Sequence, residues 1–110
     1  MSDCLFCKIA NGEIPVSLIG ESEHAVAFKD IHPKQPMHFL VVPKQHFGDV
    51  AELAESNPAV LTDLVQLGVS LSKKHSDGSF RLQFNTGAGA GQTVFHAHGH
   101  FMSRGVVGLD

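Results

Sequence analysis

Apolar residues in this chain fall into short runs separated by polar segments, a pattern typical of β-strands. Three runs in the first half predict strands at residues 16–20, 25–29 and 39–42, with polar and proline-containing turns between them. Because strands joined by such turns usually pair with each other, we expect an antiparallel meander. Two later runs, at residues 81–85 and 94–102, predict the remaining strands.

The first residues predict a short helix. Asp3 can cap a helix that runs from residue 4 to about residue 11, where Gly12 supplies a stop. Cys4 and Cys7 then share one helix face. A disulfide between them would close a very short loop and is not expected in a reducing compartment, which leaves a metal site or a redox pair.

One long helix is expected at residues 59–74, after Asn57 as cap and Pro58 in the first turn. Its apolar positions cover about 200° of the helix surface, twice the stripe that packing on one sheet requires. These positions are Val60, Leu61, Leu64, Val65, Leu67, Val69 and Leu71. Deep burial within one chain would explain the wide arc, but so small a domain has little to cover it, so we expect a homodimer.

These elements predict an α+β fold with about five antiparallel strands and two helices. The 110 residues are about one domain's length, so a single domain over residues 1–110 is expected. Hydrophobic residues at 43% and charged residues at 17% are typical of a globular chain. The net charge of -3, without blocks of like charge, argues against nucleic acid or an anionic membrane as partner. No apolar run approaches the roughly 20 residues that span a bilayer and no signal peptide is recognisable, so a cytoplasmic location is expected.

Three of the eight histidines alternate along one predicted strand: His96, His98 and His100. Alternate strand residues face one way, so the imidazoles would lie about 6.5 Å apart on one face, with Phe95 and Ala97 facing the core. A metal-chelating strand is the simplest alternative. Since one tetrahedral ion would not usefully take three ligands from one strand, at least one histidine has another function.

The segment before these histidines is rich in glycine. Gly87, Gly89 and Gly91 permit backbone conformations in which successive amides converge on an anion, although a plain flexible hairpin loop is the alternative. The pattern matches neither a Walker loop nor a dinucleotide fingerprint. With Gln92 and Thr93 leading directly into the histidines, it predicts a phosphate site.

His98 is the expected nucleophile because it alone has a histidine on both sides on the same face. Its unperturbed pKa of about 6.5 leaves the ring mostly neutral in the cytoplasm, so it needs no separate base. A flanking imidazole can stabilise the phosphate oxygens. Arg104 is the nearest cationic residue in the sequence, which favours a phosphorus with one negative charge, such as a phosphoramidate or an internal diester.

The run at residues 91–100, Gly-Gln-Thr-Val-Phe-His-Ala-His-Gly-His, resembles the histidine-triad (HIT) motif. The resemblance continues through residues 3–9, 12–15, 27–31 and 38–46 and is greatest to the Hint branch. It implies a HIT-like fold that dimerises through the long helix and the sheet. It also implies a purine nucleoside monophosphate site and cleavage of an amine or phosphate leaving group through a nucleotidyl-histidine intermediate.

The resemblance also assigns roles to residues. His98 is the nucleophile, and His100, Gln92 and Thr93 contact phosphate or the leaving group. Asn85 and Gly91 line the phosphate pocket. Apart from the resemblance, His96 is expected to be a zinc ligand or a relay member. Asp30 binds the ribose hydroxyls, although an aspartate there commonly closes a turn. The base-binding wall comprises Leu5, Phe6, Ile9, Phe28 and Ile31, of which Phe28 and Ile31 would otherwise be simple core.

Zinc-bearing relatives in the wider family place ligands at positions matching Cys4, Cys7, His46 and His96. A two-thiolate, two-imidazole set suits zinc. In the zinc-free alternative the thiols are free and His46 bonds to His96. No organic cofactor is expected.

Three other functions stay open. These are a dinucleoside polyphosphate hydrolase of the Fhit type, a non-catalytic zinc module and a nucleotide-binding sensor. Among the remaining histidines, His24, His32 and His75 are expected at the surface or in turns, and His38 is expected to form structural hydrogen bonds.

Overall fold

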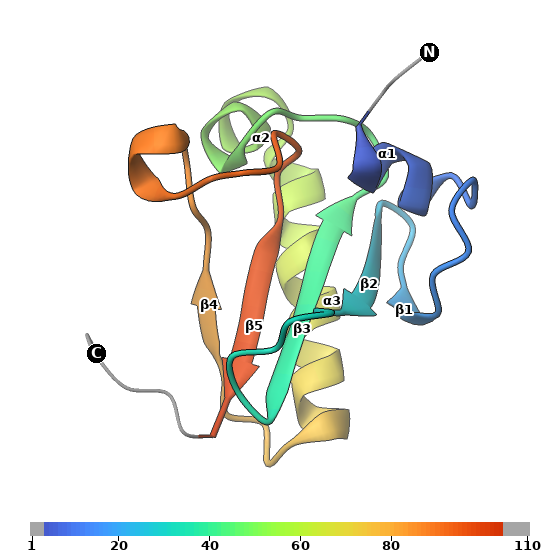
Figure 1. The fold of residues 1–110 in the computed structure, drawn as a ribbon, viewed down its shortest axis with the longest axis vertical. Helices are drawn as coiled ribbons and strands as arrows, with labels where there is room; N and C mark the ends of the chain where they lie inside the picture. The colour runs from blue at the N-terminus through green and yellow to red at the C-terminus, as the bar shows by residue number, and fades with distance from the viewer. Residues whose placement is uncertain (1–3, 105–110) are drawn as a thin grey trace.

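The structure is a computed structural model that describes residues 4–104. It is a five-stranded antiparallel sheet in the order β1-β2-β3-β5-β4, with helices on both faces (Figure 1). The elements in chain order are α1 (Leu5–Ala10), β1 (Leu18–Glu21), β2 (Ala25–Lys29), β3 (Met37–Pro43), α2 (Val50–Ser56), α3 (Pro58–His75), β4 (Arg81–Gln83), the 3-10 turn η1 (Ala88–Ala90) and β5 (Gly99–Ser103). The expected α+β class is confirmed.

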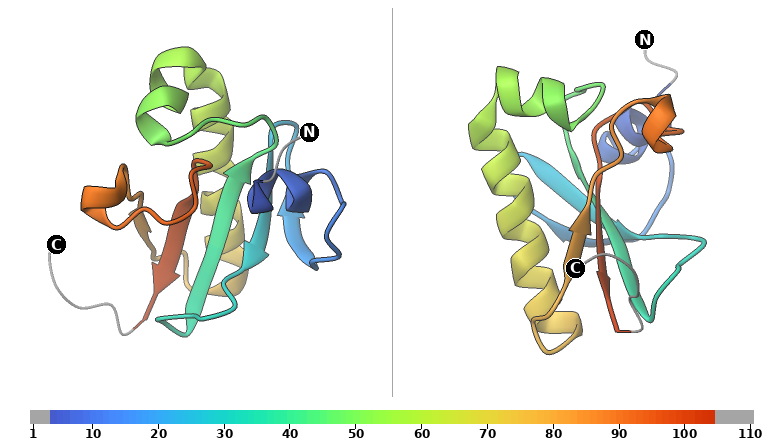
Figure 2. Two further views of the ribbon diagram at one scale, coloured as in Figure 1. Left: turned by 45° about the horizontal axis from the view of Figure 1, so that its top comes forward. Right: turned by 90° about the vertical axis from the view of Figure 1, so that its left-hand side faces the viewer.

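The two faces of the sheet have different partners. One face packs on α3 through a cluster that includes Phe39, Leu64 and Phe101. The other face carries a second cluster, in which Leu40 meets Phe6 of α1. The right-hand view of Figure 2 shows α3 on one side of the sheet and α1 on the other. Among the strands, α1 contacts β3 most.

The strand expected at residues 94–102 begins only at Gly99, so the prediction of a continuous strand through the histidines is wrong. The His96 ring is fully buried and its Nε2 lies 2.8 Å from the Pro43 carbonyl oxygen. Ala97 N–H donates to the Phe47 carbonyl. These bonds hold the segment against neighbouring loops instead of a neighbouring strand. Phe95, which was expected in the core, is 55% exposed.

The sequence prediction also missed α2. Asp49 caps this helix by accepting a hydrogen bond from Glu52 N–H, and Glu52 accepts one from Gly48 N–H. Aspartate followed three residues later by glutamate is a helix-start signal that could have been recognised. For α1, Cys4 is the cap in the structure, while the expected cap Asp3 lies outside the described residues.

The long helix begins as expected, with Asn57 as cap and Pro58 in the first turn. Its buried positions face the sheet, and three residues of the wide apolar arc, Leu61, Val65 and Leu67, pack partly against the same core. The single chain thus covers much of the arc, and dimerisation through α3 stays a prediction. Within the described residues, none of the helices is both long and apolar enough to span a membrane.

Gly68 brings α3 into close contact with the sheet. A Cβ atom at this position would overlap the ring of Phe101 on β5. The Phe101 ring is fully buried and stacks on Phe39 with ring centroids 5.2 Å apart. Gly68 therefore sets the distance between the helix and the strand that carries the last histidine of the triad.

Candidate active site

His98 lies just before β5, and its hydrogen bond fixes its tautomer. Its Nδ1 is 2.8 Å from the carbonyl oxygen of His96, and because a carbonyl only accepts, Nδ1 carries the ring proton. The neutral ring therefore has its lone pair at Nε2. Phe6 holds the ring edge-on, with centroids 5.0 Å apart. This is the arrangement that a histidine nucleophile needs.

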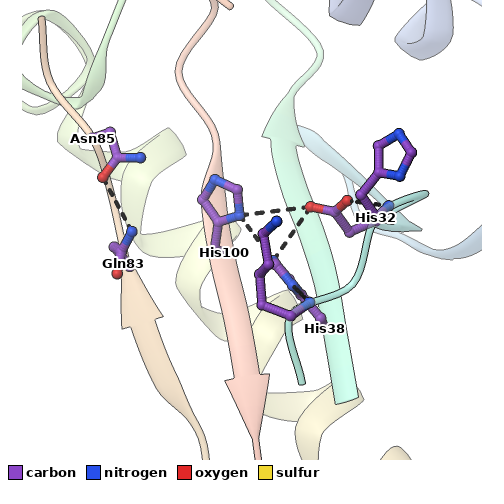
Figure 3. A network of polar contacts seen from close by, with 7 residues as sticks. His32, His38, Gln83, Asn85 and His100 are labelled. Atoms are coloured by element: carbon purple, nitrogen blue, oxygen red, sulfur yellow. Dashed lines mark hydrogen bonds and ion pairs between the residues drawn. The ribbon is translucent and has the colours of Figure 1, made fainter. Parts of the chain in front are cut away.

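His100 is held by a polar chain that crosses from β5 to β3 (Figure 3). Lys34 N–H donates to His38 Nδ1 at 2.9 Å, so the proton of a neutral His38 ring is on Nε2. His38 Nε2 lies 3.0 Å from His100 Nδ1 and 3.3 Å from an Asp30 carboxylate oxygen. Because His38 is the donor, His100 Nδ1 accepts, and the His100 proton is on Nε2.

The protonation of His100 follows from its surroundings. Burial, assisted by the nearby rings of His98 and His38, lowers the pKa of His100 to about 4. Burial also lowers the pKa of His38, against the opposing effect of Asp30. Both rings are therefore neutral at neutral pH, and His100 presents a single N–H donor.

A pocket of about 550 Å³ brings most of the predicted site residues together. Its lining contains the expected base wall, namely Leu5, Phe6, Ile9, Phe28 and Ile31. It also contains the predicted polar residues Asp30, Asn85, Gly91, Thr93, His98 and His100. One part of the lining is thus apolar and another polar, which suits a molecule with an apolar ring and a phosphate.

The sequence suggested two roles each for Asp30 and Ile31: a role in the site, and a turn for Asp30 or the core for Ile31. Asp30 Oδ1 accepts a hydrogen bond from His32 N–H at 2.8 Å, so Asp30 does close a turn, while Oδ2 contacts His38. Ile31 lines the pocket yet is 87% exposed, so it is not core. A side chain this apolar and exposed at a pocket rim can cover a bound ring.

Gln92 and the glycine loop differ from expectation. The Gln92 side chain is buried, donates to the carbonyls of Gly48 and Val94, and accepts from Gly87 N–H, so it braces the loop and does not line the pocket. The amides of Ala90, Gly91 and Gln92 also donate to carbonyls within the loop. These amides do not converge on an anion, and Asn85, Thr93 and His100 remain as polar residues that line the pocket. Asn85 Oδ1 accepts from Gln83, so its amide N–H₂ is the group available to donate.

A second group of ligand-type side chains includes His96, two residues before His98. One ligand atom from each of Cys4, Cys7, His46 and His96 falls within 4.8 Å of all the others. His96 Nδ1 is 3.3 Å from Cys4 Sγ and 3.4 Å from Cys7 Sγ, and His46 Nδ1 is 3.3 Å from Cys7 Sγ. Tetrahedral zinc, with bonds of about 2.3 Å to sulfur and about 2.0 Å to nitrogen, would separate such atoms by about 3.5 Å.

The protonation of His96 also suits a metal ligand. Its Nε2 faces the Pro43 carbonyl and must carry the ring proton, which leaves the Nδ1 lone pair directed at the sulfur atoms. Burial lowers the pKa of His96 to about 4, so the ring stays neutral. The residues present therefore fit zinc.

Asp30, His38 and His100 also lie close enough to hold an ion, but their hydrogen bonds argue against it. His38 Nδ1 accepts from a backbone amide, so Nε2 carries a proton and has no lone pair for a metal. The two clusters differ in tautomer. His96 keeps its Nδ1 lone pair for a metal, whereas His38 Nε2 carries a proton.

Known proteins resemble the chain over almost its whole length. The family model for the scavenger mRNA decapping enzyme C-terminal binding domain matches residues 3–108. Protein HitA of Neisseria gonorrhoeae is 41% identical over 104 residues, which are 93% of this chain and 96% of HitA. The chain belongs to the histidine-triad family.

Solved HIT structures agree with this fold. A HIT family hydrolase from Clostridium thermocellum is 37% identical with a TM-score of 0.90, covering 100% of this chain and 97% of that chain. A histidine triad protein from Clostridium difficile is 32% identical with a TM-score of 0.91, covering 100% and 98%. The HIT fold predicted from the sequence is thereby confirmed.

In this HIT protein, the sequence prediction understated the role of His38. The prediction of structural hydrogen bonds is accurate, but those bonds also determine which His100 nitrogen carries the proton. Its place was visible in the strand alternation, because residues 38 and 40 share a sheet face and Leu40 pairs with His100. His24, His32 and His75 are exposed, as expected.

Proposed function

We propose that this protein is a nucleotide-binding hydrolase or transferase that cleaves a purine nucleoside monophosphate from an amine or phosphate leaving group. The observation that carries the proposal is the bond from His98 Nδ1 to the His96 carbonyl, which leaves the Nε2 lone pair of a pocket-lining residue available. Among the matched structures, two are described as HIT family hydrolases and another as a histidine triad nucleotide-binding protein.

In the first step, His98 Nε2 attacks phosphorus and the bond from phosphorus to the leaving nitrogen breaks. The leaving nitrogen, which carries an added proton when it enters this step, takes the electron pair of that bond and departs as a neutral amine, while the Nε2–H of neutral His100 donates a hydrogen bond to the substrate. The nucleotidyl group is then on His98, whose ring becomes cationic. The His96 carbonyl at 2.8 Å stabilises this charge through the Nδ1 proton.

In the second step, water attacks the same phosphorus and the bond to His98 Nε2 breaks. The amine released in the first step takes the proton from the water, and His100 keeps its Nε2 proton throughout. The nucleoside monophosphate is released, and His98 returns to its neutral starting state. With an alcohol or amine in place of water, the same step is a transfer.

The leaving group distinguishes this proposal from the Fhit-type alternative. We expect kcat/KM for adenosine phosphoramidate to exceed that for diadenosine polyphosphates by at least about tenfold, or about 1.4 kcal/mol. The pocket has one apolar wall and therefore room for one base. His100 offers a single N–H donor, which suits an amine leaving group. Steady-state kinetics on both substrates measure the ratio. A ratio below one would favour the Fhit type, and binding without turnover would favour a sensor.

We also propose that Cys4, Cys7, His46 and His96 hold one zinc ion, which would link α1 to the segment before β5. Metal analysis of freshly purified, untagged protein should find about one zinc per chain. Cys7→Ser should lose the metal and lower the melting temperature, since Cys4, His46 and His96 are then no longer joined by the ion. His38→Ala is the matched control and should keep its zinc. Less than about 0.2 zinc per wild-type chain after growth with zinc would contradict the site.

A further inference from the structure

A cavity of about 340 Å³ lies where β2 ends and β3 begins, against the last residue of α3. Its apolar lining residues are Ile19, Pro33, Pro36, Met37 and Phe39. Its other lining residues are Lys29, Asp30, His38 and His75. Figure 1 shows the start of β3 and the last turn of α3 at the same end of the molecule. We call this cavity the α3-end pocket.

The α3-end pocket is distinct from the nucleotide pocket. The two share only Lys29 and Asp30. Lys29 pairs with Phe39 across the β2–β3 ladder, and directly paired residues lie on one face of a sheet. Phe39 belongs to the cluster that packs on α3, whereas Phe28 belongs to the cluster on the other face. The Lys29 side chain therefore lies on the α3 face, opposite to the base-binding wall.

Lys29 gives the α3-end pocket an available positive charge. Among residues 4–104, its ammonium group forms no ion pair. Both Asp30 carboxylate oxygens are engaged, because Oδ1 accepts from His32 N–H and Oδ2 contacts His38. The C-terminal end of a helix disfavours an anion, but the last turn of α3 carries two lysines beside His75. The pocket therefore favours an anion.

The other lining residues limit what kind of anion fits. His38 accepts a backbone N–H at Nδ1 and donates to His100 at Nε2, so no nitrogen of this ring is left for a ligand. The exposed His75 ring can donate one N–H in either neutral tautomer. Pro33 and Pro36 are exposed, and their rings are rigid apolar surfaces. A fitting ligand thus has an apolar body and one acidic group.

We infer that the α3-end pocket binds a small organic carboxylate with an apolar ring, such as a benzoic acid. Lys29 and His75 hold the carboxylate by charge-assisted hydrogen bonds, and the ring contacts the proline-lined wall. A small ligand is expected because about 340 Å³ is near the lower limit for ligand pockets. The inference does not depend on the proposed function, since none of the triad histidines lines this pocket.

The test compares benzoate with benzamide, which has nearly the same size and no charge. Titration of ¹⁵N-labelled wild type, followed by NMR, should give a Kd for benzoate of about 1 mM at low salt. The backbone amides of Lys29, Met37 and His75 should shift, and these shifts should persist in excess AMP. Benzamide should bind at least about tenfold more weakly, because it lacks the charge that Lys29 recognises.

Two variants test the residues that hold the carboxylate. Lys29→Glu should weaken benzoate binding at least about tenfold, and His75→Ala should weaken it about threefold. Lys74→Glu is the matched control, because it makes the same charge change beside His75 but outside the pocket lining. Its Kd should change by less than about twofold, since solvent and salt screen an exposed charge. The same spectra show whether each variant is folded.

Several results would overturn the inference. These are equal binding of benzoate and benzamide, no shift with benzoate, or a loss of affinity in Lys74→Glu as large as in Lys29→Glu. Shifts confined to the amides of Leu5, Phe6 and Val94 would place benzoate in the nucleotide pocket and also overturn it. None of these results bears on the proposed function, which fails if wild type cleaves no nucleotidyl substrate.

Discussion

His98→Ala is expected to abolish hydrolysis of adenosine phosphoramidate, with kcat reduced at least about 10,000-fold. Alanine removes the Nε2 lone pair that forms the bond to phosphorus. Two other histidines line the pocket, His32 and His100; the His100 ring contacts the His98 ring, and its Nε2 is already protonated. Nucleotide binding should survive, because Asp30 and the apolar wall are unchanged. Single-turnover kinetics and a binding titration measure the two effects separately.

The covalent intermediate gives an independent measurement. Rapid acid quench of the wild type, followed by peptide mass analysis, should find one nucleotidyl group on the peptide that contains His98. His24→Ala, at an exposed position far along the chain, is the matched control and should keep full activity. Turnover near the wild-type rate in His98→Ala, or an adduct on His96 or His100, would show that another residue is the nucleophile.

Gly68→Ala is expected to destabilise the fold by about 2–3 kcal/mol, although alanine normally stabilises a helix relative to glycine by about 1 kcal/mol. The sign reverses because the added methyl group overlaps the Phe101 ring, which is buried and stacked on Phe39. For a chain of this length, the melting temperature should fall by roughly 10 °C. Urea unfolding and thermal melts check the value.

Gly89→Ala is the control for this experiment, because a Cβ atom at Gly89 has nothing within 4 Å and its backbone needs no left-handed conformation. Its stability should change by less than about 0.5 kcal/mol. The double variant Gly68→Ala, Phe101→Leu should recover part of the loss, since the smaller side chain makes room for the methyl group. A Gly68→Ala protein as stable as the wild type would show that the helix can move away from the sheet without cost.

The fold could be predicted largely from local signals. The Asn57 and Pro58 start of α3 and the strand at residues 25–29 follow from capping and alternation, which depend on neighbouring residues in the sequence. The late start of β5 could not be predicted in this way. It depends on bonds to Pro43 and Phe47, more than 45 residues earlier, which replace the strand ladder at His96 and Ala97.

Site composition could be predicted better than site chemistry. The resemblance of the triad and its surroundings located the pocket residues, but the hydrogen-bond direction at each ring nitrogen required coordinates. His98 is distinguished by the His96 carbonyl, and His100 by the proton that His38 donates. For the same reason, the sequence wrongly placed Gln92 in the phosphate site. In the structure its side-chain amide forms hydrogen bonds to Gly48, Gly87 and Val94.

The site joins distant parts of the chain. His96 contacts Cys4 across 92 residues of sequence, and the Phe6 ring contacts the His98 ring. During protein synthesis, α1 leaves the ribosome long before the segment that contains His96 and His98. At about 5–20 residues per second, that segment follows on the order of ten seconds later. Until then α1 has only the sheet face around Leu40 to pack against. The contacts of His98 with α1 and the Cys/His cluster are therefore completed together, once the segment before β5 has been made.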